Sequence, residues 1–216
     1  MIIVSWNTRE LLARCLDSLF QCTSGLAWET IVVDNGSQDG SPQMVKERFP
    51  GVILLENQLN LGFAAANNQG ILASKGSHVF LLNSDTVLMD NVPLGLLSFM
   101  DTHPKAGAVG CHLVGPTGKP QAYAYGRDPT LRHLIKRNLF RAFQKGTLTR
   151  QSVQRVDWVS AAAMAVRREA LDQAGFLDEE IPMYFEDVDL CLRLRQAGWQ
   201  VWLEPHLEVV HLGGGT

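Results

Sequence analysis

The amino-acid sequence predicts an α/β fold with a mostly parallel sheet flanked by helices, on three observations. Short apolar runs of the kind found in strands buried on both faces recur at residues 2–5, 30–33, 52–55 and 78–82. Each run stops abruptly at a polar turn, and a helical segment separates it from the next run. Strand–helix units in series make a parallel sheet with right-handed crossovers, so we expect all four polar turns to gather at one edge.

The segments between these strands carry their own helix signals. Asn7 or Thr8 can cap a helix that continues through about Phe20, with its leucines on one face. A second helix opens at Ser41 and has proline next, the residue favoured at the first helical position. Residues 64–71, rich in alanine and asparagine, are expected to form a third helix ahead of the fourth strand.

The second half of the chain is less regular. A helix is expected over residues 186–197, closed by Gly198, and the glycines and prolines of residues 115–120 predict a turn. A basic amphipathic helix is expected over residues 131–143. Short strands are expected at residues 106–109, 156–160, 164–166, 200–203 and 208–211.

The composition fits one domain that spans residues 1–216, with 46% hydrophobic residues to form its core. No apolar run reaches the roughly 18 residues needed to cross a bilayer, and residues 1–4 enter a strand without a basic secretory leader. Cys15 and Cys22 lie two helical turns apart, about 10 Å, which is too far to bridge. We therefore expect a reduced, cytoplasmic setting.

The net charge of −3 hides an asymmetry along the chain. Residues 119–150 carry eight basic side chains against the single acid Asp128, a net charge of +7, which leaves −10 for the remainder. Two interpretations stay open for the amphipathic part of this segment. It contacts an anionic membrane at the inner face, where each basic side chain contributes roughly 1 kcal/mol, or it is a solvated helix packed on the domain.

The fourth strand ends in a stretch that suits metal chemistry. Asn83, Ser84 and Asp85 follow the apolar run 79–82, and open α/β sheets bind their ligands at such carboxyl ends. A carboxylate there suits Mg²⁺ or Mn²⁺ holding a diphosphate, although a polar turn capped by Asp85 would have the same sequence. Neither G-x-G-x-x-G nor G-x-x-x-x-G-K-[ST] is present, which disfavours a dinucleotide-binding sheet and a phosphate-loop hydrolase.

A second carboxylate cluster opens the helix expected at residue 186. Asp187 would sit at the helix start, where the dipole favours its ionised form, and an ionised carboxylate can take a proton from an alcohol. A helix cap with acids arranged for the dipole is the alternative. His211 follows 24 residues later at a strand end, either as a metal ligand beside a carboxylate or as a hydrogen-bonded histidine.

Together these stretches resemble the inverting family-2 glycosyltransferases of the GT-A fold, above all the rhamnosyltransferase-type enzymes that build bacterial surface polysaccharides. The resemblance covers nearly the whole chain and rests on motifs in the right order. It implies a nucleotide site formed by Ser5, Asn7, Asp34, Asn35, Asn60, Gly62, Phe63, Asn67, Asn83 and Ser84. It also implies a metal site at Asp85 and His211, a base at Asp187, and sugar or acceptor contacts from Trp158, Ser160, Ala161 and Glu186.

Two positions depart from the family pattern. Asn83 stands where the D-x-D-type metal motif has its first aspartate, and Ala161 stands where glycine is usual. The family normally continues beyond the late histidine, so truncation at the carboxyl end is expected. The resemblance further implies a nucleotide-sugar-binding half at residues 1–114 and an acceptor and catalytic half at residues 115–216.

The expected activity is metal-dependent transfer of rhamnose or another hexose from a nucleoside-diphosphate donor. The acceptor would be a hydroxyl of a glycan or lipid-linked glycan, with inversion at the anomeric carbon and with Mg²⁺ or Mn²⁺ as cofactor. No nucleic-acid partner is expected. Two alternatives stay open: a nucleotidyltransferase, which should have a glycine-rich basic loop after its first strand, and a non-catalytic module that binds nucleotide sugars.

Overall fold

A computed structural model describes residues 1–128, 152–181 and 183–213 of the chain. Its first half repeats the strand–helix unit. The parallel strands are β1 (Ile2–Ser5), β2 (Ile31–Asp34), β3 (Ile53–Glu56) and β4 (His78–Asn83), in the sheet order β3-β2-β1-β4. The helices between them are α1 (Arg9–Cys22), α2 (Ser41–Arg48) and α3 (Phe63–Ala73). Because the four strands are parallel, their polar turns do lie at one edge of the sheet, as predicted.

The second half extends the same sheet with strands of both directions. It contains β5 (Thr86–Leu88), α4 (Val92–Thr102), β6 (Ala106–Val114), β7 (Tyr125–Gly126), β8 (Gln154–Arg155), β9 (Trp158–Val159), β10 (Ala163–Arg167), α6 (Arg168–Ala174), α7 (Glu186–Gln196) and β11 (Gln200–His211). Strand β10 lies antiparallel between β4 and β6, and β11 runs parallel to β6 but antiparallel to β5 and β8. The α/β class is confirmed, with a mixed sheet.

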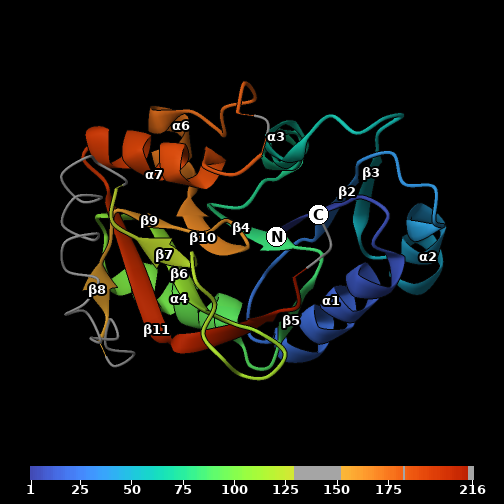
Figure 1. The fold of residues 1–216 in the computed structure, drawn as a ribbon, viewed down its shortest axis with the longest axis horizontal. Coiled ribbons are helices and arrows are strands. Elements are labelled where there is room, and N and C mark those ends of the chain that lie inside the picture. Colours follow the sequence, from blue (N-terminus) through green and yellow to red (C-terminus); the bar gives the residue numbers. More distant parts are fainter. Residues whose placement is uncertain (129–151, 182, 214–216) are drawn as a thin grey trace, which may run out of the picture.

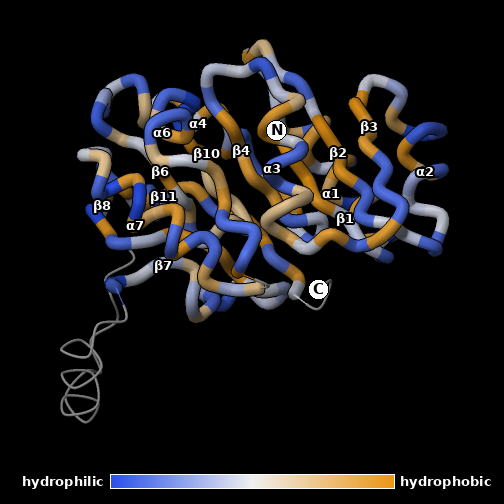
Figure 2. The backbone as a smooth tube through the Cα atoms, turned by 90° about the horizontal axis from the view of Figure 1, so that it is seen from above, coloured by the Kyte–Doolittle hydropathy of each residue, from blue (hydrophilic) through white to orange (hydrophobic). Residues whose placement is uncertain are grey.

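Helices cover both faces of the sheet (Figure 1). Side chains alternate along each strand, so Ile3 and Leu82 face α1, α2 and α4, whereas Ile2 and Leu81 face α3, α6 and α7. All four of these side chains are buried. Figure 2 shows the resulting pattern, in which the central strands carry the most hydrophobic colour. The sheet is therefore the middle layer of three and holds the polar edge rigidly.

Several elements differ from the sequence-based expectation. Residues 200–203 and 208–211 belong to one strand, β11, because Glu204 pairs with Cys111 and Glu208 with the next residue of β6, which leaves residues 205–207 as a bulge. Strands β5, β7 and β8 and helices α4 and α6 were not predicted. Asn91 caps α4 by accepting from the Leu94 amide at 3.3 Å. The expected basic helix at residues 131–143 lies outside the described residues.

The cap of α1 is also different from the prediction. Thr8 occupies the N-cap position, but its hydroxyl makes no capping bond and points to Ser84 instead. Asp39, from the turn after β2, accepts from the Arg9 amide at 2.8 Å. The turn after β1 and the turn after β2 are thereby joined.

Within the described part of the chain, the helices are too short or too polar to span a bilayer.

Candidate functional site

The turns after β1 and β2 are tied to one another at the polar edge. Asn7, in the left-handed region at φ 53°, accepts from the Gln38 amide and donates its own amide to Ser37, both at 2.8 Å. Asp34 is buried, and its Oδ2 accepts from the Ser37 amide at 2.9 Å. Its Oδ1 is buried with no hydrogen-bond partner among the described residues. One buried carboxylate oxygen therefore lacks a hydrogen-bond donor within the described part of the chain.

Asn35 acts as a hub for the turn after β3. Its Nδ2 donates to Asn60 Oδ1 at 2.7 Å and to the Gly62 carbonyl at 3.2 Å, while its Oδ1 accepts from the Leu61 amide at 3.1 Å. Gly62 adopts φ 90°, a conformation that favours glycine. The side chains of Asn35 and Asn60, predicted to bind the nucleotide, are thus largely used to shape the turn.

Two further predicted nucleotide residues lie at the start of α3. Phe63 is the first residue of that helix and is half-buried. Asn67 is buried and donates to the Phe63 carbonyl one turn earlier at 2.9 Å. Its neighbour Asn68 donates to the Leu177 carbonyl and accepts from the Leu177 amide, which connects α3 to the loop ahead of α7.

A chain of buried hydroxyls joins the ends of β1 and β4. Ser5 Oγ lies 2.9 Å from Thr8 Oγ1, which donates to Ser84 Oγ at 3.1 Å. All three residues are buried. These hydrogen bonds fix the turn after β4, which carries Asp85, relative to the turn after β1. Ser5 and Ser84 therefore support the site from the buried side.

Asp85 and His211 come together at this edge although 126 residues separate them in sequence. Asp85 Oδ1 lies 3.1 Å from His211 Nε2, and the carboxylate is almost completely buried. The Asp85 carbonyl also accepts from the Leu212 amide at 2.9 Å. Asn83 Nδ2 approaches His211 Nε2 at 3.4 Å, while its buried Oδ1 has no partner within the described ranges.

The spacing of this pair fits a divalent cation. Two adjacent ligands of an octahedral ion, with bonds of about 2.0–2.1 Å at right angles, are about 3 Å apart. Across the described residues, no group of three His, Cys, Asp or Glu side chains is arranged to hold a metal. A cation between Asp85 and His211 would take its other ligands from water, from phosphate oxygens, or from Asn83 Oδ1, as Mg²⁺ and Mn²⁺ commonly do.

Asp187 lies in the first turn of α7 and faces the turn that follows β9. Its Oδ2 accepts from the Ala161 amide at 3.2 Å and its Oδ1 from the Val188 amide at 2.8 Å. Burial raises the pKa of the Asp187 carboxyl above its ordinary value, and this outweighs the hydrogen bonds from Ala161, Val188 and the Ser160 hydroxyl. Burial therefore shifts the pKa of Asp187 in the direction opposite to that expected from the helix dipole.

Glu186 shares this environment. Its side chain is buried, its Oε2 has no partner among the described residues, and burial raises its pKa with a smaller contribution from the charge of Asp187. The two residues before it, Tyr184 and Phe185, adopt left-handed φ of 63° and 72° and are exposed. Non-glycine residues persist there only when the surroundings impose it, so the entry into α7 is strained.

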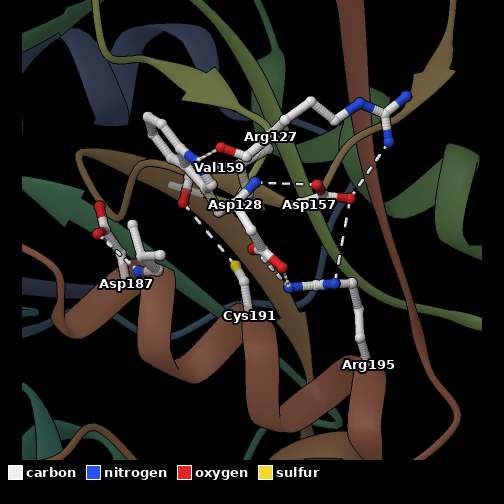
Figure 3. A network of polar contacts seen from close by, with 9 residues as sticks. Arg127, Asp128, Asp157, Val159, Asp187, Cys191 and Arg195 are labelled. Atoms are coloured by element: carbon white, nitrogen blue, oxygen red, sulfur yellow. Dashed lines mark hydrogen bonds and ion pairs between the residues drawn. The ribbon is translucent and has the colours of Figure 1, made fainter. Parts of the chain in front are cut away.

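An ionic network fixes α7 against the segments that follow β7 and precede β9 (Figure 3). Arg195 Nη2 lies 2.7 and 2.8 Å from the two carboxylate oxygens of Asp128, and Arg195 Nη1 lies 4.0 Å from Asp157. Asp157 also accepts from the Asp128 amide at 2.9 Å and from Arg127 at 3.2 Å. Figure 3 shows Asp187 at one end of the helix and Arg195 further along it.

Trp158 and Ser160 flank this network. The Trp158 indole donates to the Arg127 carbonyl at 3.1 Å, and its ring packs so closely on Gly126 that a Cβ there would lie 2.8 Å from it. Ser160 donates its amide to the Ala124 carbonyl at 2.9 Å. Ala161 is buried with its side chain in the core shared with α7. These residues form the wall opposite Asp187.

Several residues of the site escaped the sequence analysis. Thr8 was treated only as a cap, and Gln121, which contacts His211, lies in an irregular stretch with no distinguishing signal. Arg195 could have been found from the sequence, because it lies eight residues after Asp187 and therefore on the same side of the helix.

A cavity of about 310 Å³ lies away from this site, at the amino ends of the strands, and is lined by residues that include Trp28, Lys75 and His78.

The profile of Glycosyl transferase family 2 matches residues 1–175, most of the chain. The chain belongs to this family. It is a glycosyltransferase with rhamnosyltransferase-like sequence features, as predicted. The chain is 31% identical over 230 aligned residues to N-acetylglucosaminyl-diphospho-decaprenol L-rhamnosyltransferase of Mycobacterium tuberculosis, an alignment that covers 98% of this chain and 75% of the relative.

A more distant relative is poly-beta-1,6-N-acetyl-D-glucosamine synthase of Staphylococcus aureus, 26% identical over 82% of this chain and 41% of its own length. Solved structures show the same fold. GalNAc-T7 with UDP, GalNAc and Mn²⁺ matches 98% of this chain at a TM-score of 0.75 and 16% identity. The mannosyltransferase PcManGT of Pyrobaculum calidifontis, in complex with GDP-Man and Mn²⁺, matches 97% at a TM-score of 0.68 and 19% identity. This chain spans 43% and 55% of those two chains.

Proposed function

We propose that this chain is an inverting, metal-dependent glycosyltransferase that moves a hexose from a nucleoside diphosphate to a hydroxyl of a glycan or lipid-linked glycan. The observation that carries the proposal is the environment of the Asp187 carboxylate. Its carboxylate is buried, its pKa is raised, and both of its oxygens are oriented by backbone amides. A carboxylate with a raised pKa is a stronger base than an ordinary aspartate.

In the proposed reaction, Asp187 Oδ2 takes the proton of the acceptor hydroxyl as that oxygen attacks the anomeric carbon of the donor. The bond from the anomeric carbon to the diphosphate breaks on the opposite side, and the electron pair leaves with the diphosphate. A single in-line displacement inverts the configuration. The amides of Ala161 and Val188 hold the base in one orientation, which lowers the entropy lost on reaching the transition state.

Asp85 and His211 would hold the cation in this proposal, and Asn83 would lie beside it. When bound, the cation neutralises the charge that develops on the leaving diphosphate. Two solved structures with the same fold contain Mn²⁺, which supports this assignment. Asp34 Oδ1 and the turn shaped by Asn35 would position the nucleotide, with residues 1–114 as the donor half and residues 115–216 as the acceptor half.

The relatives support the choice of substrates. The mycobacterial relative is named as an L-rhamnosyltransferase that acts on N-acetylglucosaminyl-diphospho-decaprenol. We therefore propose a rhamnose-type donor and a lipid-linked acceptor, with Trp158 and Ser160 on the acceptor wall. The entry to α7, where Glu186 is buried and its Oε2 lacks a partner among the described residues, would contact the transferred sugar or the acceptor.

A two-stage experiment tests the proposal. Thermal shift with a set of nucleoside-diphosphate sugars, with and without Mn²⁺, identifies the donor, because binding to the native state raises the melting temperature. Nuclear magnetic resonance of the product then gives the anomeric configuration. Inversion is expected. Retention would reject the mechanism, and donor binding with no turnover on any glycan acceptor would instead support a non-catalytic binding module.

We also propose that the basic amphipathic segment at residues 131–143 contacts anionic lipid, at the cytoplasmic face of the membrane. The net charge of +7 over residues 119–150, in an otherwise acidic chain, supports this. Cosedimentation with phosphatidylserine-containing vesicles should fall with salt and with Arg132, Lys136, Arg137 and Arg141 changed to Glu. Binding that ignores both changes would reject the membrane contact and leave the transferase proposal unaffected.

A further inference from the structure

Gln121 holds His211 at two points. Gln121 Oε1 lies 2.8 Å from His211 Nδ1, and Gln121 Nε2 donates to the His211 backbone carbonyl at 2.7 Å. The loop that carries Gln121 is itself fixed, because the Gln121 amide donates to the Leu113 carbonyl at 2.9 Å and Pro120 bridges to Val114 at the end of β6. One side-chain amide therefore clamps the imidazole from a rigid position.

The directions of these two bonds determine the histidine tautomer. A backbone carbonyl only accepts, so the amide nitrogen of Gln121 must face the His211 carbonyl, and the amide oxygen must face Nδ1. An amide oxygen also only accepts, so Nδ1 carries the hydrogen. In the neutral imidazole, Nε2 then presents a lone pair, and this atom is the one 3.1 Å from Asp85 Oδ1.

At 3.1 Å, Nε2 and Asp85 Oδ1 form an ion pair if Nε2 also carries a proton, whereas in the neutral imidazole the lone pair and the carboxylate oxygen repel unless a cation lies between them. The neighbouring Asn83 Nδ2, at 3.4 Å from Nε2, is a weak partner at best. We propose that Gln121 is a positioning residue of the metal site, which holds His211 in the Nδ1–H tautomer so that Nε2 and Asp85 bind one divalent cation. This inference rests on the proposed metal-dependent transfer and adds a residue to its site.

The alternative role for Gln121 is a tether that joins its loop to the end of β11. The two roles separate by substitution. Gln121→Glu keeps an acceptor for Nδ1–H but cannot donate to the His211 carbonyl, whereas Gln121→Met fills the space and does neither. If Gln121 sets the tautomer, Gln121→Glu should keep the wild-type tautomer and Mn²⁺ affinity, and Gln121→Met should lose both. If Gln121 is only a tether, the two variants should lose Mn²⁺ affinity equally.

The first readout is the tautomer itself. Two-bond ¹H–¹⁵N spectra at a pH of about 8, where free imidazole is neutral, separate the tautomers, and His211→Ala identifies the His211 signals. The wild type and Gln121→Glu should show the Nδ1–H form, and Gln121→Met should populate the Nε2–H form. An Nε2–H form in the wild type, or an unchanged tautomer in Gln121→Met, would overturn the inference.

The second readout is affinity for Mn²⁺ alone, measured by water proton relaxation. Loss of an outer partner of a ligand histidine typically costs about 10–100-fold in metal affinity, and we expect this in Gln121→Met but not in Gln121→Glu. Gln43→Met, on exposed α2, is the matched control and should bind like the wild type. Equal loss in both Gln121 variants would support the tether. If the wild type binds no Mn²⁺, this inference fails, while turnover with a donor would still support the transferase.

Discussion

The donor side and the acceptor side of the site are held in different ways. On the donor side, the turns after β1, β2 and β3 bind one another through short neutral side chains such as Asn7 and Asn35. On the acceptor side, charged residues far apart in sequence join α7 to the segment after β7, where Arg195 binds Asp128. The donor side uses its polar groups to stay rigid, whereas the acceptor side keeps Glu186 and Asp187 buried with raised pKa values.

The largest expected effect is loss of the base. Asp187→Asn should lower turnover by about 10²–10⁴-fold and leave donor affinity unchanged, because the two sides of the site are built separately. Steady-state kinetics and donor binding by calorimetry measure both quantities. The matched control is Asp189→Asn, which removes the carboxylate bonded to Arg193 on the same helix and should retain turnover. Near-normal turnover in Asp187→Asn would reject the assignment.

Substitution of Asp85 and His211, the proposed metal ligands, tests the donor side of the site. Asp85→Ala should abolish the Mn²⁺ dependence of donor binding, and His211→Ala should weaken it less, because a carboxylate adds charge where an imidazole adds only a lone pair. Calorimetry with and without Mn²⁺ distinguishes the two. Asp90→Ala, which changes an exposed carboxylate in the following turn, is the control. Unchanged Mn²⁺ dependence in Asp85→Ala would move the metal site elsewhere.

The ionic network should have a smaller, one-sided effect. Arg195→Met removes the charge that holds Asp128 and Asp157, so Ala161 and Asp187 lose their fixed separation. We expect turnover to fall about tenfold at unchanged donor affinity, since misplacement of about 1 Å can cost up to 10²-fold. Arg195→Lys should restore part of it. An equal loss of donor affinity would show that the two sides are not independent.

The smallest expected effect is on stability as a function of pH. Because the folded-state pKa of Asp187 lies above its unfolded value, the folded state binds this proton more tightly. The stabilisation from the proton is present at low pH and is lost as pH rises through the folded pKa. The unfolding free energy of the wild type, relative to Asp187→Asn, should therefore decrease as the pH rises above about 4, the ordinary pKa of an aspartate. Urea denaturation at several pH values measures it, and an increase would contradict the burial argument.

Much of the donor side could be predicted from sequence because its rules are local. A buried strand that ends in a polar turn, repeated four times, predicts both the parallel direction of the strands and the edge of the sheet on which Asp34 and Asp85 lie. Helix α7 and the position of Asp187 at its start were also predicted. The family resemblance then joined these pieces, and the family match confirmed it.

The remainder depends on contacts between distant segments, for which a single sequence carries no local signal. The antiparallel direction of β10 follows from its pairing with β4 and β6, not from its own residues. Helix α4 contains Gly95, which disfavours a helix, but its lack of a side chain leaves room for Leu207 of β11. The pKa of Asp187 depends on burial beneath segments that the helix itself does not reveal.

The bulge in β11 has a consequence for how this chain can change in evolution. Residues 205–207 have no partners on β6, whereas Glu208 onward is paired in strict register up to the strand end near His211. An inserted or deleted residue inside the bulge would be absorbed there. A single insertion among residues 208–210 would turn the imidazole to the opposite face of the sheet, since side chains alternate along a strand. Length variation among descendants should therefore accumulate at residues 205–207 and be selected against at residues 208–210.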